Sequence, residues 1–286
     1  MNWGDLVSNG AVLTDGAWGT ELQKRGLSAG ECPDAWNLSH PEEVADIARS
    51  YREAGSRVIL TNTFRANPIS LAAHGLADRT AVINRAGVKL SRNAAGTALV
   101  FASIGPSGKL LTAGEVTGDE LLAAFRTQAE ALAAGGADAL LLETFSELEE
   151  ALLALRAAAT TGLPVIVSFA FDTGKNKDRT MTGLTPERAA KVITEAGADA
   201  VGANCGVGIE QLVELCRRMR AATHLPLWMK PNAGLPEFAD GAVEYHVTAQ
   251  QFASSVPFLR DAGANFIGGC CGTNAEFIRA TAAVLS

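Results

Sequence analysis

Short apolar runs rich in Val, Ile and Leu alternate along the chain with longer, Ala-rich amphipathic stretches. A continuous apolar run is typical of a strand buried in a parallel sheet, and the stretch between two such runs is typical of a covering helix. Eight runs, each of about five to eight residues, fit this description. They begin near Ala11, Arg57, Ala98, Ala137, Leu163, Ala198, Leu225 and Ala264. The pattern therefore predicts an α/β fold of eight strand–helix units.

A similar short sequence recurs at four of the predicted connections between a helix and the next strand. The segments EAGSRVIL, AGGADALLL, EAGADAVGA and DAGANFIGG each combine a helix end, a glycine cap and the start of a strand. Eight such units favour a closed (β/α)8 barrel of the TIM type, although a doubly wound open sheet has the same ingredients. A barrel of 286 residues is ordinary, and no Pro/Ser-rich linker divides the chain. We therefore expect residues 1–286 to form one domain.

Composition narrows the class of protein. Hydrophobic residues make up 48% and charged residues 19%, which suits an ordered globular chain. The net charge is −7 and no basic run is clustered, so nucleic acid is not an expected partner. The N-terminal residues do not resemble a signal peptide, and no apolar stretch is long enough to cross a bilayer. Five cysteines, two of them adjacent, suit a reducing compartment, so we expect a cytoplasmic protein without a membrane partner.

Barrel enzymes carry their chemistry at the C-terminal ends of the strands, so the residues that follow each apolar run are informative. These positions are polar and include several groups that bind metals or charged ligands. They are Asp15 and Gly16, Thr61 to Thr63, Glu143 and Thr144, Asn204 and Cys205, Lys230 and Asn232, and Cys270 and Cys271. The sequence thus predicts one polar site at the barrel mouth.

Three cysteines converge at this mouth: Cys205, Cys270 and Cys271. Three thiolates without a fourth protein ligand suit a catalytic zinc, because tetrahedral zinc then keeps one position for water or substrate. Each cysteine taken alone reads as a small buried hydrophobe, and a Cys270–Cys271 disulfide is a further alternative. Their joint placement favours metal. Cys32 is expected in a loop and Cys216 on the buried side of a helix, so neither receives a ligand role. The four histidines show no ligand spacing.

Asp15 and Glu143 are the two carboxylates at the predicted mouth. One reading is that they cap the helices that follow their strands. The other is that they bind the ammonium of an amino acid while neighbouring backbone N–H groups bind its carboxylate. In that case an amino acid with a thiol would be held against the zinc.

Seven segments together resemble one family. They are DGAWGTEL from Asp15, PDAWNLSHPE from Pro33, TNTFRAN from Thr61, LLLETF from Leu140, GANCGVG from Gly202, KPNAGLP from Lys230 and GGCCGT from Gly268. Across nearly its whole length the chain resembles the homocysteine S-methyltransferases, especially the homocysteine-binding module of cobalamin-dependent methionine synthase.

The resemblance implies a zinc site formed by Cys205, Cys270 and Cys271. It also implies that Asp15 and Glu143 engage the homocysteine ammonium. The full set of candidate substrate-binding residues is Asp15, Gly16, Ala17, Asn62, Glu143 and Asn232. Within this set, the backbone near Gly16 and Ala17 is expected beside the substrate, and Asn232 near the zinc.

The expected activity is zinc-dependent methyl transfer to the thiol of L-homocysteine, which forms methionine. GGCCGT together with TNTF is similar to the branch that takes its methyl group from methylcobalamin, here expected on a separate corrinoid protein because the chain has no room for further modules. Betaine or S-methylmethionine as donor, and another thiol as acceptor, are alternatives. A zinc hydrolase and a zinc-binding module without turnover are the competing classes.

Overall fold

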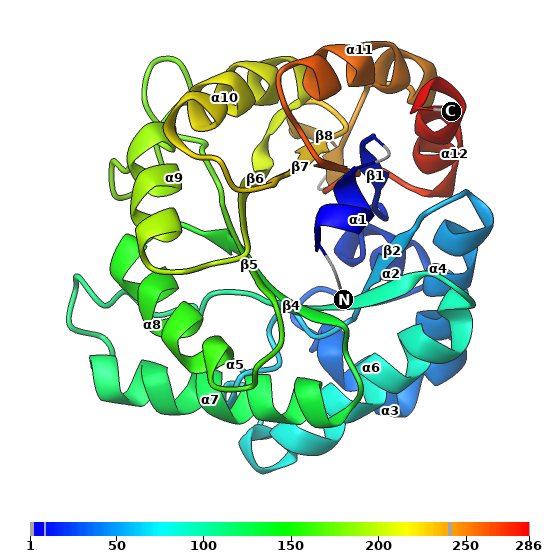
Figure 1. Cartoon of the computed structure of the whole chain (residues 1–286). Coiled ribbons are helices and arrows are strands. Elements are labelled where there is room, and N and C mark those ends of the chain that lie inside the picture. The colour runs from blue at the N-terminus through cyan, green and yellow to red at the C-terminus, as the bar shows by residue number, and fades with distance from the viewer. Residues whose placement is uncertain (1–2, 9, 240–241, 286) are drawn as a thin grey trace.

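The computed structural model describes residues 3–8, 10–239 and 242–285, and its centre is a barrel of eight parallel strands (Figure 1). The strands are β1 (Val12–Leu13), β2 (Val58–Leu60), β3 (Leu99–Ile104), β4 (Ala139–Phe145), β5 (Val165–Phe169), β6 (Ala200–Gly208), β7 (Leu227–Asn232) and β10 (Phe266–Ile267). Their order in the sheet is β1-β10-β7-β6-β5-β4-β3-β2. The predicted (β/α)8 architecture is confirmed, and the open-sheet alternative is not adopted.

Strand lengths differ from the expected five to eight residues. β1 and β10 have two residues each and β2 has three, whereas β6 has nine. Single hydrogen bonds continue the pairing beyond the short strands, for example from Gly269 N to the carbonyl of Asp15 at 3.0 Å.

The seam between β1 and β2 is closed without a regular ladder in the described part of the chain. Arg57 N donates to the carbonyl of Leu13 at 2.8 Å, and Leu60 N donates to Oδ2 of Asp15 at 2.7 Å. A side-chain carboxylate thus replaces a main-chain acceptor at this point. Asp15 is therefore part of what closes the barrel.

Helices form a ring outside the sheet (Figure 1). The longer ones are α4 (Pro41–Glu53), α6 (Thr80–Ala95), α7 (Gly118–Ala134), α8 (Leu148–Ala159), α9 (Pro186–Glu195), α10 (Ile209–Ala222), α11 (Ala249–Asp261) and α12 (Ala275–Leu285). Shorter elements are α1 (Trp3–Val7), α2 (Gly19–Lys24), η1 (Pro33–Ala35), α3 (Trp36–Ser39), α5 (Pro68–Ala72), η2 (Ala77–Arg79) and the hairpin β8 (Glu237–Ala239) and β9 (Ala242–Glu244).

The four predicted glycine junctions are confirmed. Gly55, Gly136, Gly197 and Gly263 follow their helices with φ between 85° and 107°, a range that residues with a Cβ rarely adopt. Each glycine reverses the chain at a helix end and directs it into the next strand.

Apolar side chains fill the interior of the barrel, so ligands have access only at an end. The inner cluster consists of Val12, Val58, Leu60, Phe101, Ala139, Leu141, Ile166, Ala200, Trp228 and Phe266. Leu6 and Val7 of α1 pack against this cluster. A second and larger cluster lies between the strands and the helices. With the interior filled, a binding site inside the barrel wall has room only beyond the ends of the strands.

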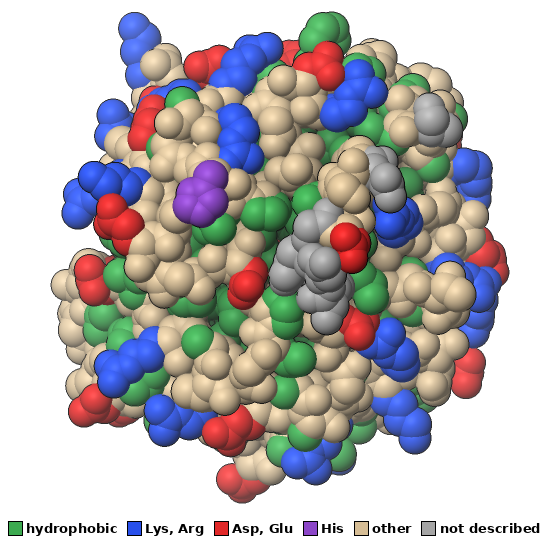
Figure 2. Space-filling view, in the orientation of Figure 1, with side chains coloured by type: hydrophobic (Ala, Val, Ile, Leu, Met, Phe, Trp, Pro, Cys, Tyr) green, Lys and Arg blue, Asp and Glu red, His purple; other side chains and the backbone are tan. Residues whose placement is uncertain are grey.

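The surface carries mixed charge. On the face shown in Figure 2, Lys and Arg side chains alternate with Asp and Glu around the periphery. This view shows no large patch of one sign, in keeping with the absence of a clustered basic run in the sequence. Among the helices of the described segments, none is both long and apolar enough to cross a bilayer.

Candidate metal centre and substrate cavity

A cavity of about 260 Å³ lies at the C-terminal ends of the strands. Seven of the predicted site residues line it: Gly16, Ala17, Asn62, Glu143, Cys205, Cys270 and Cys271. The other two predicted residues, Asp15 and Asn232, are buried close by but are not part of its lining. The strand ends thus bring most of the predicted residues into one space.

The three predicted ligand cysteines lie together. One ligand atom from each of Cys205, Cys270 and Cys271 falls within 4.8 Å of the other two, and the Sγ atoms of Cys205 and Cys271 are 3.8 Å apart. Two sulfurs bonded to one tetrahedral zinc at about 2.3 Å are separated by about 3.8 Å, so the spacing fits this metal. All three cysteines are free thiols, so Cys270 and Cys271 do not form the disulfide considered as an alternative.

Without a metal these thiols are hard to ionise. The pKa of Cys205 is raised to about 12, because its contact with Cys271 and its burial outweigh the lowering effect of Cys270. The pKa of Cys271 is also raised to about 12, since proximity to Cys270 and burial outweigh the contact with Cys205. Binding of a divalent metal here would therefore displace protons.

Irregular backbone aims Cys205 at the cavity. Cys205 has φ 61°, in the left-handed region that residues with a Cβ seldom occupy, and Gly206 follows with φ 70°. The β6–β7 pairing shifts register between Asn204 and Gly208. The irregularity ends the regular pairing just where the candidate metal ligand occurs, as bulges beside functional sites commonly do.

Asn204 holds this irregular segment. Its Oδ1 accepts hydrogen bonds from Thr144 N at 2.9 Å and from Ser168 Oγ at 2.6 Å. Its Nδ2 donates to Thr144 Oγ1 at 2.7 Å and lies 3.9 Å from the sulfur of Cys270. Thr144 also has positive φ, at 65°. One buried amide therefore joins the distorted ends of β4 and β6 and contacts a candidate ligand.

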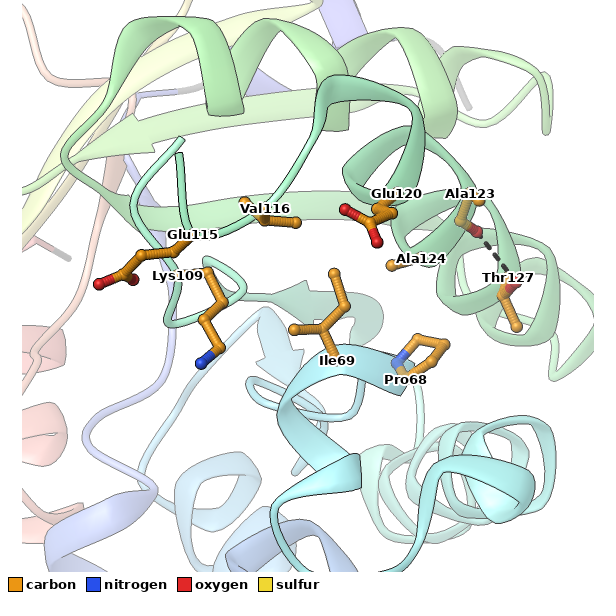
Figure 3. Close-up of a pocket in the computed structure, with 9 residues that line it drawn as sticks. All are labelled: Pro68, Ile69, Lys109, Glu115, Val116, Glu120, Ala123, Ala124 and Thr127. Atoms are coloured by element: carbon orange, nitrogen blue, oxygen red, sulfur yellow. Dashed lines mark hydrogen bonds between the residues drawn. The ribbon is translucent and has the colours of Figure 1, made fainter. Parts of the chain in front are cut away.

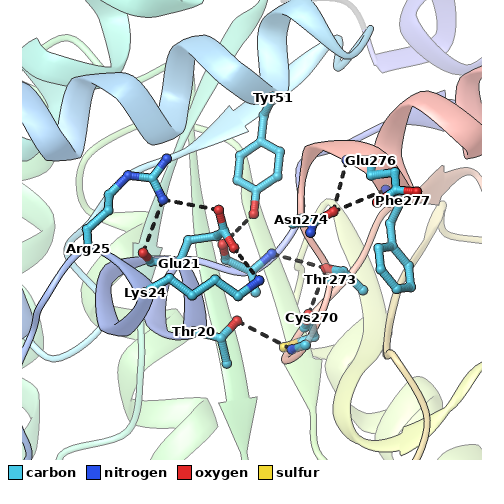
Figure 4. A network of polar contacts seen from close by, with 12 residues as sticks. Thr20, Glu21, Lys24, Arg25, Tyr51, Cys270, Thr273, Asn274, Glu276 and Phe277 are labelled. Atoms are coloured by element: carbon cyan, nitrogen blue, oxygen red, sulfur yellow. Dashed lines mark hydrogen bonds and ion pairs between the residues drawn. The ribbon is translucent and has the colours of Figure 1, made fainter. Parts of the chain in front are cut away.

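The loop that carries Cys270 and Cys271 is tied to the segment after β1 (Figure 4). Thr273 Oγ1 donates to the carbonyl of Cys270 at 2.7 Å and accepts from Ala17 N at 3.2 Å. The hydroxyl of Tyr51 donates to the carbonyl of Ala17 at 2.5 Å. A Cβ at Gly268 would lie 2.0 Å from Thr14 Oγ1, so only glycine permits this close approach.

A buried ion pair stands at the base of the cavity. Lys230 Nζ lies 2.5 Å from Oδ1 of Asp15, and both side chains are almost fully buried. Oδ2 of Asp15 accepts hydrogen bonds from Trp18 Nε1 at 2.8 Å and from Leu60 N at 2.7 Å. Both carboxylate oxygens of Asp15 are therefore occupied by groups of the protein. A direct contact between Asp15 and a substrate ammonium stays a prediction.

Glu143 reaches the cavity from β4. Its carboxylate accepts a hydrogen bond from Ser103 Oγ at 2.5 Å. Burial raises the pKa of Glu143, and the negative charge of Asp15 raises it further. The positive charge of Lys230 and the hydrogen bond from Ser103 lower this pKa and so oppose the rise. Glu143 and Lys230 thus both line the cavity, and the charge of Lys230 favours the ionised form of the Glu143 carboxyl.

Asp34 was missed by the sequence reasoning, although it lies within the PDAWNLSHPE segment. It lines the cavity, and Oδ1 accepts from Arg65 N at 3.1 Å. Oδ2 is buried without a hydrogen-bond partner in the described structure. Burial raises the pKa of Asp34 from 3.8 to about 7, against the lowering effect of Arg65. The only available indication was an acidic residue just before a short helix.

The two predicted asparagines differ in their surroundings. Asn62 lines the cavity, but its Nδ2 already donates to the carbonyl of Pro33 at 2.8 Å and to Oδ1 of Asn37 at 3.1 Å. Asn232 is buried and its Oδ1 has no hydrogen-bond partner among the described residues. Their roles in binding substrate or metal stay predictions.

A second hollow lies outside the barrel, beside α5 and α7 (Figure 3). It measures about 450 Å³ and is lined by Pro68, Ile69, Lys109, Glu115, Val116, Glu120, Ala123, Ala124 and Thr127. The residues lining it include neither Cys nor His. The chemistry therefore points to the smaller cavity at the strand ends.

Comparison with known proteins identifies the family to which the chain belongs. The family described as homocysteine S-methyltransferase matches residues 12–285. Methionine synthase from Mycobacterium tuberculosis is 30% identical over 299 residues, which cover 99% of this chain and 25% of the relative. The chain thus spans about a quarter of the length of this curated relative. The methionine synthase of Mycobacterium leprae is similar, with 29% identity and the same coverage.

A solved structure is similar over nearly its full length. The metallated form of the homocysteine methyltransferase MmuM from Escherichia coli has a TM-score of 0.79 and 27% identity, with 96% of each chain covered. The carboxyl transferase domain of Rhizobium etli pyruvate carboxylase, at 14% identity and a TM-score of 0.57, shares the fold alone.

Proposed function

Because the chain belongs to the homocysteine S-methyltransferase family, we propose that it transfers a methyl group to the sulfur of L-homocysteine and forms methionine. The observation that carries this proposal is the meeting of three free thiols, the Glu143 carboxylate and the buried Lys230 ammonium in the lining of one cavity. The thiols suit a metal that binds sulfur, and the charged wall suits the head of an amino acid.

We propose zinc as the metal and Cys205, Cys270 and Cys271 as its ligands. When bound, zinc supplies an open coordination position at which a thiol is held as thiolate near neutral pH. Asn204 fixes the cysteine-bearing strand, and Thr273 fixes the loop of Cys270. These contacts set the ligand geometry in advance, which favours reaction by keeping the sulfur oriented.

Glu143 then binds the ammonium of homocysteine rather than acting as a base. It lines the cavity and shares it with Cys270, whose pKa responds to the Glu143 charge. The sulfur forms a bond to the methyl carbon as the bond between methyl and donor breaks, and the electron pair of that bond stays with the donor. No protein nucleophile is needed for this transfer.

For the donor we propose methylcobalamin on a separate corrinoid protein, with this chain acting as one homocysteine-binding domain. Support comes from the similarity to a quarter of methionine synthase and from the GGCCGT and TNTF segments. S-methylmethionine or betaine is the second candidate, favoured by the similarity to MmuM over its whole length. Five free thiols suit the cytoplasm as the location.

The test is methyl transfer by zinc-loaded protein under anaerobic conditions, with free methylcobalamin, S-methylmethionine and betaine supplied in parallel. Methionine formation together with the change in cobalamin absorbance, abolished by a zinc chelator, supports the cobalamin donor. Methionine from one of the other donors alone supports the second candidate. Ester hydrolysis without methionine would identify a zinc hydrolase, and zinc binding without any turnover would identify a non-catalytic module.

A further inference from the structure

Tyr245 lies beside the loop of Cys270 and Cys271, and the function proposed above gives it no task. It follows β9 directly in the sequence and is half-buried. Its ring packs on the main chain of Gly272, where a Cβ would lie 2.3 Å from Cγ of Tyr245, so only glycine leaves room. Gly272 comes immediately after Cys271, and this packing therefore fixes Tyr245 next to a candidate metal ligand.

The hydroxyl of Tyr245 interacts with the Cys271 sulfur. The two side chains are close enough to share a hydrogen bond. A phenol has an ordinary pKa of about 10 and carries its proton at neutral pH, whereas a thiolate has no proton to donate. Tyr245 is therefore the donor whenever Cys271 is ionised.

A metal centre of this type needs such donors. A divalent metal bound by three thiolates carries one excess negative charge, and a fourth thiolate from the acceptor raises the excess to two. Excess charge in a partly buried site is costly unless hydrogen-bond donors face it. Hydrogen bonds to the sulfurs are a general means by which proteins orient and tune metal-bound thiolates.

Each of the three candidate ligands has an N–H or O–H donor beside its sulfur. The donors are the Asn204 amide for Cys270, the Gly206 main chain for Cys205 and the Tyr245 hydroxyl for Cys271. Asn204 and Gly206 belong to β6, whereas Tyr245 reaches the cluster from outside the barrel strands. The Tyr245 hydroxyl thus gives the third sulfur the kind of partner that the other two have.

We propose that Tyr245 is a positioning residue of the metal centre, which donates a hydrogen bond to the Cys271 thiolate and withdraws charge from that sulfur. The inference rests on the proposed function, because it concerns the same metal and the same cysteines. It goes further by assigning a task to a residue outside both the barrel strands and the cavity lining. Without this bond the charge stays on the sulfur, and the metal-bound form is less stable.

The experiment uses the full chain loaded with Co²⁺, which takes tetrahedral thiolate sites as zinc does and has sulfur-to-cobalt charge-transfer bands in the near ultraviolet. In Tyr245→Phe these bands should move to lower energy, because a thiolate without a hydrogen bond releases its electrons more easily. Competition with a chelator should show that zinc affinity falls on the order of 10-fold. Circular dichroism checks that the variant is folded.

A second variant separates the hydroxyl from the ring. Tyr245→Phe keeps the ring on Gly272 and removes only the hydroxyl, whereas Tyr245→Leu removes both. The proposal expects the band shift in both variants. If Tyr245→Phe matches the wild type in its bands and its zinc affinity, the hydroxyl has no role at the metal and the proposal is wrong.

Tyr51→Phe is the matched control, because Tyr51 is the other tyrosine of the chain and donates to the carbonyl of Ala17 rather than to sulfur. It should leave the charge-transfer bands in place. An equal shift in Tyr51→Phe and Tyr245→Phe would show that the position of the loop sets the bands, and would overturn the proposal.

Replacing both tyrosines by 3-fluorotyrosine gives a test without loss of a side chain. The fluorinated phenol is more acidic and a stronger donor, so the bands should move to higher energy. The same replacement in Tyr245→Phe labels Tyr51 alone and should cause no such shift. Absence of the shift in the wild-type chain contradicts the proposal, whereas failure of the unmodified wild type to bind Co²⁺ or zinc would instead reject the proposed metal centre.

Discussion

The sulfur side of the cavity (Cys205, Cys270 and Cys271) and its charged side (Asp15, Glu143 and Lys230) satisfy their polar groups in opposite ways. On the charged side each group has a protein partner: Asp15 pairs with Lys230, and Glu143 with Ser103. On the sulfur side the thiols mainly face one another, at 3.8 Å between Cys205 and Cys271.

The two sides differ in whether they require a metal ion from outside the chain. Each group of the charged side already has a protein partner in the folded chain, and Asp15 helps to close the barrel through Leu60 N. The sulfur side has high thiol pKa values and becomes a set of thiolates only when a metal displaces the protons. The fold should therefore be independent of metal, whereas activity should require it.

The largest expected loss of activity comes from removing one of the three cysteines of the sulfur side. Cys270→Ser removes one of three thiolate ligands, so bound zinc should fall below about one tenth per chain and methyl transfer by about 1,000-fold or more. Elemental analysis and the methyl-transfer assay measure both. Circular dichroism should show the metal-free variant folded at 25 °C.

Cys216→Ser is the matched control, because Cys216 is buried in α10 away from the cavity. This variant should keep its zinc. Full zinc and full activity in Cys270→Ser would remove the metal assignment, and unfolding of the metal-free wild type would show that the two sides are not independent.

A smaller effect is expected where the irregular strands are joined. Asn204→Ala leaves Thr144 N and Ser168 Oγ without their acceptor, which should lower the free energy of unfolding by about 2 to 4 kcal/mol. Loss of the support behind the cysteines should weaken zinc binding on the order of 10- to 100-fold. Urea unfolding and competition with a chelator measure these quantities.

Asn204→Asp keeps the acceptor oxygens and loses the donors to Thr144 Oγ1 and Cys270, so it should fall between the wild type and Asn204→Ala. Wild-type zinc affinity in Asn204→Ala would mean that the sulfur side holds its geometry without this amide.

The smallest expected effect concerns Asp34 and pH. In the unfolded chain its carboxyl ionises near pH 4, whereas in the folded protein its pKa is about 7. Between these values the folded state keeps a proton that the unfolded state loses, so stability falls as pH rises and stays lower above pH 7. Asp34→Asn should remove this fall and be more stable above pH 7.

The expected gain for Asp34→Asn is about 1 to 2 kcal/mol at pH 8, less than the full linkage value because Asp34 borders a cavity that water can enter. Urea unfolding at pH 5, 7 and 9 measures it, with exposed Asp78→Asn as the control. Equal pH profiles for Asp34→Asn and the wild type would show that Asp34 is ionised in the folded protein throughout.

Much of the fold and of the candidate metal site could be predicted from the sequence. The apolar runs specified eight strands, because a strand buried in a parallel sheet needs a continuous apolar segment. The positions of Cys205 and Cys270 at strand ends placed both thiols at one rim, since parallel strands of a barrel all end on the same side. Glu143 reached the cavity by the same rule.

Only the tertiary structure decided how the charges are paired. Lys230 and Asp15 are 215 residues apart, and they meet because closing the barrel brings β1 and β7 to either side of β10. Lys230 lines the cavity and Asp15 does not, while Asp34 reaches the cavity from η1, which no strand precedes directly to mark it. Apolar periodicity determines which elements form. Hydrogen-bond partners depend on distances between atoms remote in sequence, and those distances are set only when the sheet closes.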